Sequence, residues 1–347
     1  MIQVRRRAFL SFFACSLATL GLACSSDGGD ATDTGGALDT TAQAQDSDAS
    51  QATAADLPDV IVTYSVLASI VRELVEGVAD VVTIIPDGRN PHDFEPSAKD
   101  IEAINNAAFV VANGLGFEQG LDASLEKLRD EKGPVFFVGE RVTVREMAEG
   151  HGHGDGDDHG DGDDHSDDHH SDDHHGDDHH GDGDPHVWMS PATMIEMLPE
   201  LADELGAVLG TDLSASLAAV TADLTALDAE VAAIMSGVKK CEFVTGHDEM
   251  GYFAGRYGCE LIGAIIPSTT TTAEASAGEL AKLKEVILEH GTKVVFVTLG
   301  TPQAVAAQIA KETGASLVEL PTDSMGTATS YAEFMKSIAN RIADALK

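Results

Sequence analysis

Short apolar runs alternate with amphipathic segments along the chain from Leu57 onward. The first four runs predict strands at Val60–Thr63, Val81–Ile85, Phe109–Ala112 and Val135–Val138. A second set follows residue 238 and predicts strands at Glu242–Thr245, Leu261–Ile266, Val294–Thr298 and Ser316–Leu320. Helical segments such as Ser65–Val75 and Ser97–Asn105 separate the strands. Such alternation is typical of parallel sheets covered by helices, so the pattern predicts an α/β protein with two lobes of similar size.

One longer apolar stripe lies between the two sets of predicted strands. Its members recur at spacings of three and four residues: Leu213, Leu217, Val220, Leu224, Leu227, Val231 and Ile234. The spacing predicts one amphipathic helix of about seven turns. A coiled-coil strand is the alternative, but the stripe covers only about three heptads and contains many alanines. We therefore expect two lobes of parallel sheet flanked by helices, joined by one long and stiff bridging helix.

The N-terminal residues have the pattern of an export signal. The arginines Arg5-Arg6-Arg7 precede an apolar run, Ala8–Leu22, that is short for a membrane span. The arginines also fit a twin-arginine signal, so the general secretory route and the twin-arginine route both stay open. Cys24 follows small and apolar residues, as at a bacterial lipoprotein cleavage site, and the alternative is a plain secretory signal cut near Ala23. We expect residues 1–24 to be a signal peptide with Cys24 as the lipidated residue.

Two segments contain almost no apolar side chains. Residues 25–56 are mostly Ala, Asp, Thr, Ser, Gln and Gly and predict a disordered tether. His151–Asp184 consists of ten His, fourteen Asp, eight Gly and two Ser, so it cannot form a packed core and predicts a flexible loop. This composition suits weak binding of divalent metal, and a solvated spacer is the alternative. The candidate weak ligands are His151, His153, His159, His165, His169, His170, His174, His175, His179 and His180.

The balance of charge and the cysteines limit the possible partners. The formal net charge of the 347 residues is −38, so a nucleic-acid partner is not expected. Beyond the leader there are two cysteines, Cys241 and Cys259, and an even pair in an exported protein suggests one disulfide. Each precedes a predicted strand, and consecutive parallel strands start at the same sheet edge, so the two could meet. Two free buried thiols are the alternative.

Four polar residues share one topological position, because each follows the carboxyl end of a predicted strand. Two come from each predicted lobe: His92, His186, His247 and Asp323. Ligands of open α/β sheets bind at this edge, and clefts between domains are preferred sites. Three imidazoles and a carboxylate suit a borderline divalent ion such as zinc, whose occupancy should fall as the histidines protonate below about pH 6.5.

Each of these residues also has an ordinary interpretation. A lone histidine near a strand end is more often a simple polar residue than a ligand. Asp323 could cap the following turn, and Asp248 or Glu249, beside His247, could replace it as the oxygen ligand. His290 lies near a predicted helix C-terminus, where its interaction with the helix dipole is a sufficient explanation, and we assign it no ligand role.

The segments around these residues resemble a known family. They are Pro91-His92-Asp93-Phe94-Glu95-Pro96-Ser97, Asn113-Gly114-Leu115-Gly116-Phe117-Glu118, Asp184-Pro185-His186-Val187-Trp188 and Pro321-Thr322-Asp323-Ser324. They are similar to segments of the metal-specific solute-binding lipoproteins of bacterial ABC transporters, the zinc/manganese class. The resemblance runs from about Leu57 to Lys347. It implies two lobes bridged by one long helix, with one metal held between them by His92, His186, His247 and Asp323. It also implies that the histidine-rich insertion is a mobile loop of the zinc-specific members.

We therefore expect a monomeric protein of the periplasm or cell surface, anchored in the membrane through lipid at Cys24. It would capture zinc as cargo and deliver it to an ABC permease, without being an enzyme. Manganese is the alternative metal, but manganese-preferring members of the family often carry a carboxylate where this chain has His247. A zinc hydrolase is a further alternative, although the sequence lacks His-Glu-x-x-His and Gly-x-Ser-x-Gly and four protein ligands leave no position for a reacting water. A sequestering or adhesive surface protein is another.

The expected domain organisation follows from these boundaries. It comprises a signal peptide (1–24), a tether (25–56), an N-terminal lobe (57–205) that includes the flexible loop (151–184), a bridging helix (206–237) and a C-terminal lobe (238–347).

Overall fold

The computed structural model describes residues 57–146 and 183–347, which belong to one unit, Ala54–Lys347. The expected signal peptide, Cys24, the tether and the ten histidines of the acidic tract lie outside the described residues. Among the helices of the two described ranges, none is both long enough and apolar enough to cross a bilayer.

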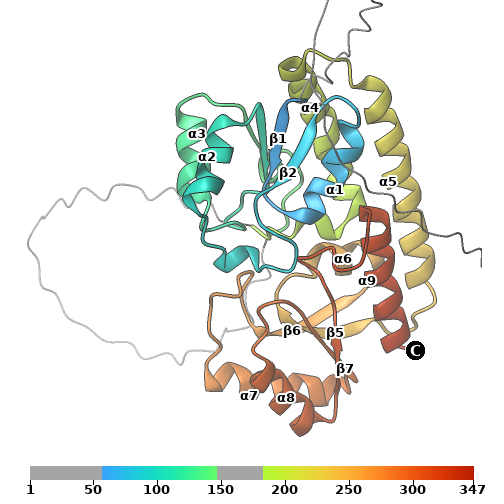
Figure 1. Ribbon diagram of the computed structural model, residues 1–347. Coiled ribbons are helices and arrows are strands. Elements are labelled where there is room, and N and C mark those ends of the chain that lie inside the picture. The colour runs from blue at the N-terminus through green and yellow to red at the C-terminus, as the bar shows by residue number, and fades with distance from the viewer. Residues whose placement is uncertain (1–56, 147–182) are drawn as a thin grey trace, which may run out of the picture. The chain divides into compact units, whose positions relative to one another are not determined.

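The N-terminal lobe is built on a parallel sheet of four short strands (Figure 1). The strands are β1 (Asp59–Val62), β2 (Asp80–Thr83), β3 (Phe109–Ala112) and β4 (Val135–Phe137), in the order β2-β1-β3-β4. The two central strands, β1 and β3, are almost wholly buried. That burial explains their continuous runs of Val, Ile and Phe, because helices cover both faces of such a sheet. The helices of this lobe are α1 (Ser65–Leu74), α2 (Ala98–Asn106), α3 (Asp122–Asp130) and α4 (Pro191–Leu209), with the 3₁₀ turns η1 (Pro91–Asp93), η2 (Val138–Glu140) and η3 (Val187–Met189).

The C-terminal lobe repeats the same topology. Its strands are β5 (Glu242–His247), β6 (Glu260–Ile266), β7 (Val294–Val297) and β8 (Ser316–Glu319), all parallel in the order β6-β5-β7-β8. Its helices are α6 (Gly251–Tyr257), α7 (Ala277–His290), α8 (Gln303–Thr313) and α9 (Tyr331–Ala345). In both sheets the first strand lies between the second and the third. The chain therefore reverses its direction across the sheet beside β1 and beside β5, and this is where open α/β sheets bind ligands.

Every predicted strand is present, and its observed ends differ from the prediction by at most two residues. Two strands differ by two residues: β2 ends at Thr83 instead of Ile85, and β5 continues through His247 instead of ending at Thr245. The strand can continue because Gly246 has no side chain: a Cβ there would lie 1.9 Å from Thr301 Oγ1. The predicted α/β class with two parallel sheets is confirmed.

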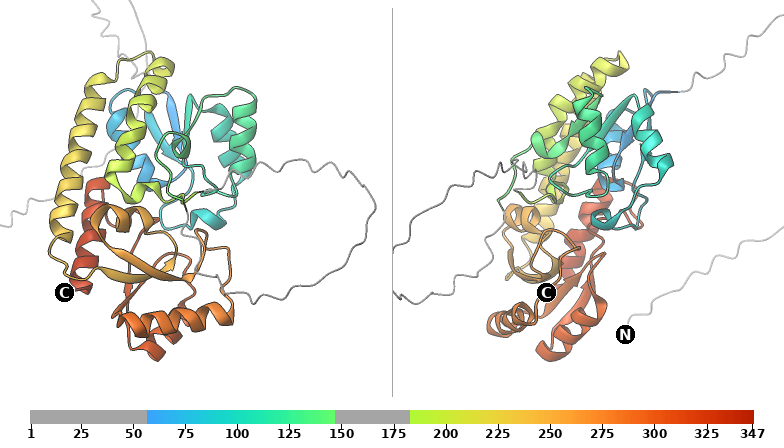
Figure 2. Two further views of the ribbon diagram at one scale, coloured as in Figure 1. Left: turned by 180° about the vertical axis from the view of Figure 1, so that it is seen from behind. Right: turned by 90° about the vertical axis from the view of Figure 1, so that its left-hand side faces the viewer.

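The predicted bridging helix is α5 (Ser214–Met235), and it contacts elements of both lobes. It packs on α1 and α4 of the N-terminal lobe and on α6 and α9 of the C-terminal lobe, and Figure 2 shows it running alongside α4 and then α9. Its buried face is Val220, Leu224, Leu227, Val231 and Met235. On its polar side Asp228 accepts hydrogen bonds from Arg256 and, at 3.0 Å, from the Tyr257 hydroxyl. The helix is therefore fixed to the C-terminal lobe by polar contacts as well as by packing.

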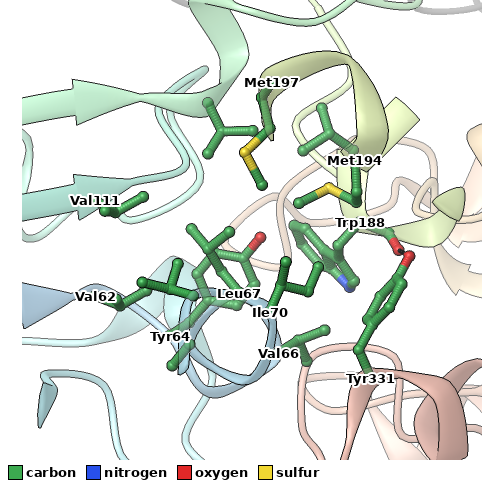
Figure 3. Close-up of a cluster of buried hydrophobic side chains, with 14 of the residues drawn as sticks. Val62, Tyr64, Val66, Leu67, Ile70, Val111, Trp188, Met194, Met197 and Tyr331 are labelled. Carbon is green, nitrogen blue, oxygen red and sulfur yellow. Dashed lines mark hydrogen bonds between the residues drawn. The ribbon is translucent and has the colours of Figure 1, made fainter. Parts of the chain in front are cut away.

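One hydrophobic cluster is shared by the two lobes, and Trp188 lies within it (Figure 3). The indole is fully buried, 4.9 Å from the Tyr64 ring between centroids. Its Nε1 donates to Thr322 O at 2.8 Å, and its backbone carbonyl accepts from the Tyr331 hydroxyl at 2.6 Å. Thr322 and Tyr331 both follow β8, so this one residue connects the core of the first lobe with the second.

Cys241 and Cys259 form the predicted disulfide, with their Cα atoms 4.6 Å apart. They immediately precede β5 and β6, which lie side by side and begin in register at Glu242 and Glu260. The bond thus closes a short loop containing α6, at the end of β5 opposite His247.

We predict that replacing Cys241 and Cys259 together by serine lowers the free energy of unfolding by about 3 kcal/mol. A closed loop of this length removes about that much entropy from the unfolded chain. Urea unfolding of the wild type and the variant measures the difference. Reductant should lower the stability of the wild type by a similar amount and leave the variant unchanged, whereas equal stabilities of the two proteins would contradict the cross-link.

Candidate metal centre

Three of the four predicted ligands converge where the two sheets face each other. His92 is the middle residue of η1, His186 immediately precedes η3, and His247 is the last residue of β5. All three are buried. One ring nitrogen of each lies within 4.8 Å of one nitrogen of the other two, and the ring centroids are 5.0–5.6 Å apart. Residues from both lobes therefore form a single imidazole cluster.

Asp323 lies beside this cluster, next to His247. It lies in the loop after β8, is buried, and has a carboxylate oxygen within 4.8 Å of ligand atoms of His247 and Glu249. Glu249 is also fully buried, and its Oε2 accepts a hydrogen bond from Thr322 Oγ1 at 2.7 Å. The geometry thus brings two carboxylates to the C-terminal side of the cluster. Asp248, the other acidic neighbour of His247, is not grouped with the potential ligands among the described residues.

Asp184 determines which nitrogen of His186 faces the cluster. Its Oδ1 lies 2.9 Å from His186 Nδ1 and accepts the backbone N–H of the same residue at 3.0 Å. Because a carboxylate only accepts, the Nδ1 carries the hydrogen and Nε2 presents its lone pair. This pairing of carboxylate and imidazole is the usual support of a histidine that binds metal. In the sequence Asp184 is the last residue of the acidic tract, and the local pattern predicts no separate role for it.

His247 is oriented in a similar way. Its Nδ1 faces Thr298 Oγ1 at 3.4 Å and Glu249 Oε2 at 3.5 Å, while its Nε2 lies 3.2 Å from His186 Nε2. When both Nδ1 atoms carry their hydrogen, the two Nε2 lone pairs point at each other. A cation between them would stabilise that arrangement.

Several buried polar atoms around this point have no partner within residues 57–146 and 183–347. They are both ring nitrogens of His92, both carboxylate oxygens of Asp323 and Oε1 of Glu249. A buried polar atom without a partner is costly, and native structures contain few of them. Their concentration beside the facing Nε2 atoms fits the binding of a cation with nitrogen and oxygen ligands.

Burial also shifts the titration of this cluster. Desolvation, and then the nearby His186, lowers the pKa of His92 to about 3, and the same causes hold the pKa of His247 well below its ordinary value. Desolvation raises the pKa of Asp323 to about 6, and desolvation with the charge of Asp323 raises the pKa of Glu249 well above its ordinary value. His92 and His247 therefore stay neutral, as metal binding requires. A bound dication would favour the ionised carboxylates.

Aromatic rings form the wall of the centre on the side of the N-terminal lobe. Phe117 packs edge-on against His92 with ring centroids 5.1 Å apart, and Trp188 lies 5.3 Å from His186. Phe117 and Trp188 also pack against each other at 4.5 Å. All of these side chains are buried, so the imidazoles are held in an environment of low dielectric that strengthens their interaction with a cation.

The loop after β3 contacts Pro185, the residue before His186. The Asn113 side chain donates to Pro185 O at 2.9 Å and accepts from the Tyr64 hydroxyl at 3.0 Å. The loop itself wraps around Glu118, which accepts from Asn113 N, from Gly114 N and from Thr63 Oγ1. Residues 114–116 all have positive φ, which the two glycines allow with little strain. The Asn113–Glu118 motif is therefore a support for the centre, a role that its local sequence does not reveal.

The remaining histidines considered in the sequence are His290 and those of the acidic tract. His290 is the last residue of α7, and its Nδ1 lies 3.2 Å from Glu242 Oε2, apart from the cluster. It is not part of either group of potential ligands in the described part of the chain. The ten tract histidines lie outside the described residues.

The comparisons with known proteins agree on the class of the chain. Residues 60–345 match the model of the family described as ZnuA, zinc-uptake complex component A, periplasmic. The high-affinity zinc uptake system protein ZnuA of Haemophilus ducreyi is 31% identical over 296 residues, which are 83% of this chain and 93% of that protein. The zinc-binding protein AdcA of Streptococcus pyogenes is 28% identical over 261 residues, 74% of this chain. The chain spans about half the length of the AdcA proteins, with 48% covered.

Solved structures share the fold at lower identity. The periplasmic zinc binding protein TroA from Treponema pallidum has a TM-score of 0.69 at 22% identity, covering 84% of this chain and 99% of that one. A Mn-bound periplasmic metal binding protein from Candidatus Liberibacter asiaticus has a TM-score of 0.66 at 18% identity, covering 84% and 100%. One architecture thus occurs in a zinc-binding and in a manganese-bound protein, so the fold alone does not select the metal.

We predict that the His92→Asn substitution makes the metal-free protein less sensitive to acid. The pKa of His92 is about 3 in the folded protein and about 6.5 in the unfolded chain. Between these values the unfolded chain binds a proton that the native protein does not, so the contribution of His92 falls as the pH falls below 6.5. The loss is about 1.4 kcal/mol per pH unit.

The measurement is urea unfolding of chelator-treated wild type and variant at pH 7.0, 6.0 and 5.0. The stability of the wild type should fall relative to the variant over this range, while groups common to both proteins cancel in the comparison. Parallel stability curves would show that His92 is not held neutral in the native protein.

Proposed function

The chain belongs to the periplasmic zinc-uptake component A (ZnuA) family, and from this premise we propose that it captures Zn(II) outside the cytoplasm and delivers it to an ABC permease. Proteins of this family are solute-binding components of transport systems and not enzymes. The ion is therefore cargo: it has to be bound tightly enough to be collected and released intact at the membrane.

The proposal rests on a set of buried nitrogen and oxygen atoms between the two lobes that have no hydrogen-bond partner among the described residues. We propose that His92, His186 and His247 each give one nitrogen to the ion and that Asp323 completes the coordination. Three imidazole ligands and one carboxylate would leave a dication with a single compensating charge. Glu249, 3.5 Å from His247 Nδ1, is placed to supply a second charge from outside the coordination sphere. A closed set of four protein ligands holds an ion without offering it a reacting water.

Zinc is the metal that this ligand set favours. Imidazole nitrogen suits zinc, whereas manganese prefers carboxylate, carbonyl and water oxygen. The four side chains come from four different segments. Asp184 and the Asn113 loop support His186 and its neighbour Pro185, and Thr298 contacts His247.

The parts of the chain outside the described residues have proposed roles as well. Residues 1–24 would direct export, Cys24 would carry a lipid anchor, and residues 25–56 would act as a tether to the membrane. The histidines between His151 and His180 would bind zinc weakly and raise its concentration near the lobes. Weak sites tethered beside a strong one act through effective concentration.

The test is a competitive titration of zinc and manganese into chelator-stripped protein that starts at Ser25. The matched variant lacks residues 151–182 and so keeps Asp184, the partner of His186. We predict one tight zinc site in both proteins and several weak sites only in the protein with the tract. The His247→Ala variant should lose the tight site, because removal of a direct ligand affects affinity more than the 10–100-fold typical of an outer partner.

Three results would contradict the proposal. Loss of tight binding together with the tract would place the main site in the tract. Preference for manganese would exclude the assigned metal. Unchanged zinc affinity in the His247→Ala variant, while the protein remains folded, would exclude the assigned ligands.

We predict separately that Asp184→Asn weakens zinc binding by about 10–100-fold without abolishing it. An amide at this position no longer fixes the hydrogen on Nδ1 of His186, so the lone pair of Nε2 is no longer secured for the ion. The matched control is Asp203→Asn, an exposed carboxylate on α4. Equal affinities of the Asp184→Asn variant and the control would show that Asp184 does not orient the imidazole.

A further inference from the structure

One exposed carboxylate joins the loop after β2 to the loop after β8. Asp87 Oδ1 accepts hydrogen bonds from Ser65 Oγ at 2.7 Å and from Met325 N at 2.6 Å. Its Oδ2 accepts from Ser324 Oγ and from Gly326 N, both at 3.2 Å. Ser65 belongs to the same lobe as Asp87, and the other three donors belong to the opposite lobe. We call this set of four hydrogen bonds the Asp87 clamp.

The clamp holds the backbone that carries Asp323. Its three donors from the C-terminal lobe are the three residues that follow Asp323 in the chain. On the preceding side, Trp188 Nε1 donates to the carbonyl of Thr322. Asp323 therefore lies between two anchors to the N-terminal lobe, one on each side in sequence.

A second contact between the lobes starts from the same loop. Asn90, two residues before His92, donates from Nδ2 to Thr271 Oγ1 at 2.7 Å. The backbone of Gly300 approaches this contact closely, since a Cβ on Gly300 would lie 3.0 Å from Asn90 Nδ2. The short segment from the end of β2 through η1 thus carries one histidine of the centre and contacts the loops after β6 and after β8.

The two anchors of Asp323 differ in how easily they can break. Trp188 is fully buried, so separating it from Thr322 would expose an indole and a carbonyl. Asp87 is exposed, and a cavity of about 460 Å³ beside it is lined by Ser65, Arg72, Thr83, Met325 and Thr329. Water in this cavity can replace the donors of the clamp one by one. The clamp is therefore the anchor that can open without disturbing the core.

We propose that Asp87 is a positioning residue that holds the Asp323 loop on the N-terminal lobe and thereby sets the rate at which the bound cation leaves. The proposal rests on the capture function proposed above and concerns release, which that function leaves unspecified. With the clamp closed, Asp323 stays beside His247. With the clamp open, the loop after β8 can swing away with its carboxylate while the three histidines remain in place.

The test compares Asp87→Asn with Asp80→Asn. Asparagine has the shape of aspartate but turns an amide donor toward the backbone N–H groups of Met325 and Gly326, so the clamp cannot form fully. Asp80, on β2, is also exposed, and no side-chain hydrogen bond of it is found in the described part of the chain. Stopped-flow transfer of zinc to a strong chelator should show dissociation about tenfold faster in Asp87→Asn, equivalent to about 1.4 kcal/mol. Asp80→Asn should match the wild type, and association rates should be equal in all three proteins.

Hydrogen exchange tests the clamp without any metal. In the metal-free protein, the amides of Met325 and Gly326 should exchange about tenfold faster in Asp87→Asn than in the wild type or in Asp80→Asn. Unchanged exchange would exclude the clamp itself. Faster exchange with an unchanged zinc dissociation rate would exclude its role in release and leave the capture function intact. A wild-type protein without tight zinc binding would overturn the capture function, and the role in release with it.

Discussion

Burial of uncompensated lone pairs at the seam of two lobes is the constraint on which the other features of this protein depend. The cluster holds three imidazoles and two carboxylates away from water, and several of their atoms have no partner in the described residues. Such an arrangement is unfavourable by itself and persists only because the surrounding structure fixes it. That fixing comes from Asp184, from the Asn113 loop and from Trp188, each of which contacts a residue of the centre or its immediate neighbour.

The second constraint is stiffness. A bridging helix packed on both lobes, with a hydrophobic cluster that continues across them, does not allow the wide hinge of proteins joined by extended linkers. Exposed hydrogen bonds between the lobes lie in loops at the sheet edges, as at Asp87, where water can replace them. The three histidines are buried and fixed by their neighbours, whereas the Asp87 clamp is exposed. This division would suit the proposed role of a carrier that releases its ion without unfolding.

The sequence predicts the fold well because its signals are local. Buried strands such as β3 and β7 consist of consecutive apolar residues, and the stripe from Leu213 to Ile234 has helical spacing. The sequence places the three histidines and Asp323 at the same edge of the predicted sheets, and the structure brings their side chains close together; their role as ligands stays a prediction. The extension of β5 to His247 could not be predicted, because it depends on the space that Gly246 leaves for the Thr301 side chain. The supporting residues were also missed: the contact of Asn113 with Pro185 joins positions 72 residues apart and leaves no local pattern.

Trp188 is the only tryptophan of the chain, and it lies inside the wall of the metal centre. Its indole is shielded from solvent, 5.3 Å from the ring of His186, and bonded to the carbonyl that precedes Asp323. All of the intrinsic indole emission of this protein therefore originates at one point, between a histidine of one lobe and the carboxylate loop of the other. Trp188 is therefore an intrinsic fluorescent probe, and its emission should change when an ion binds at the candidate centre or leaves it.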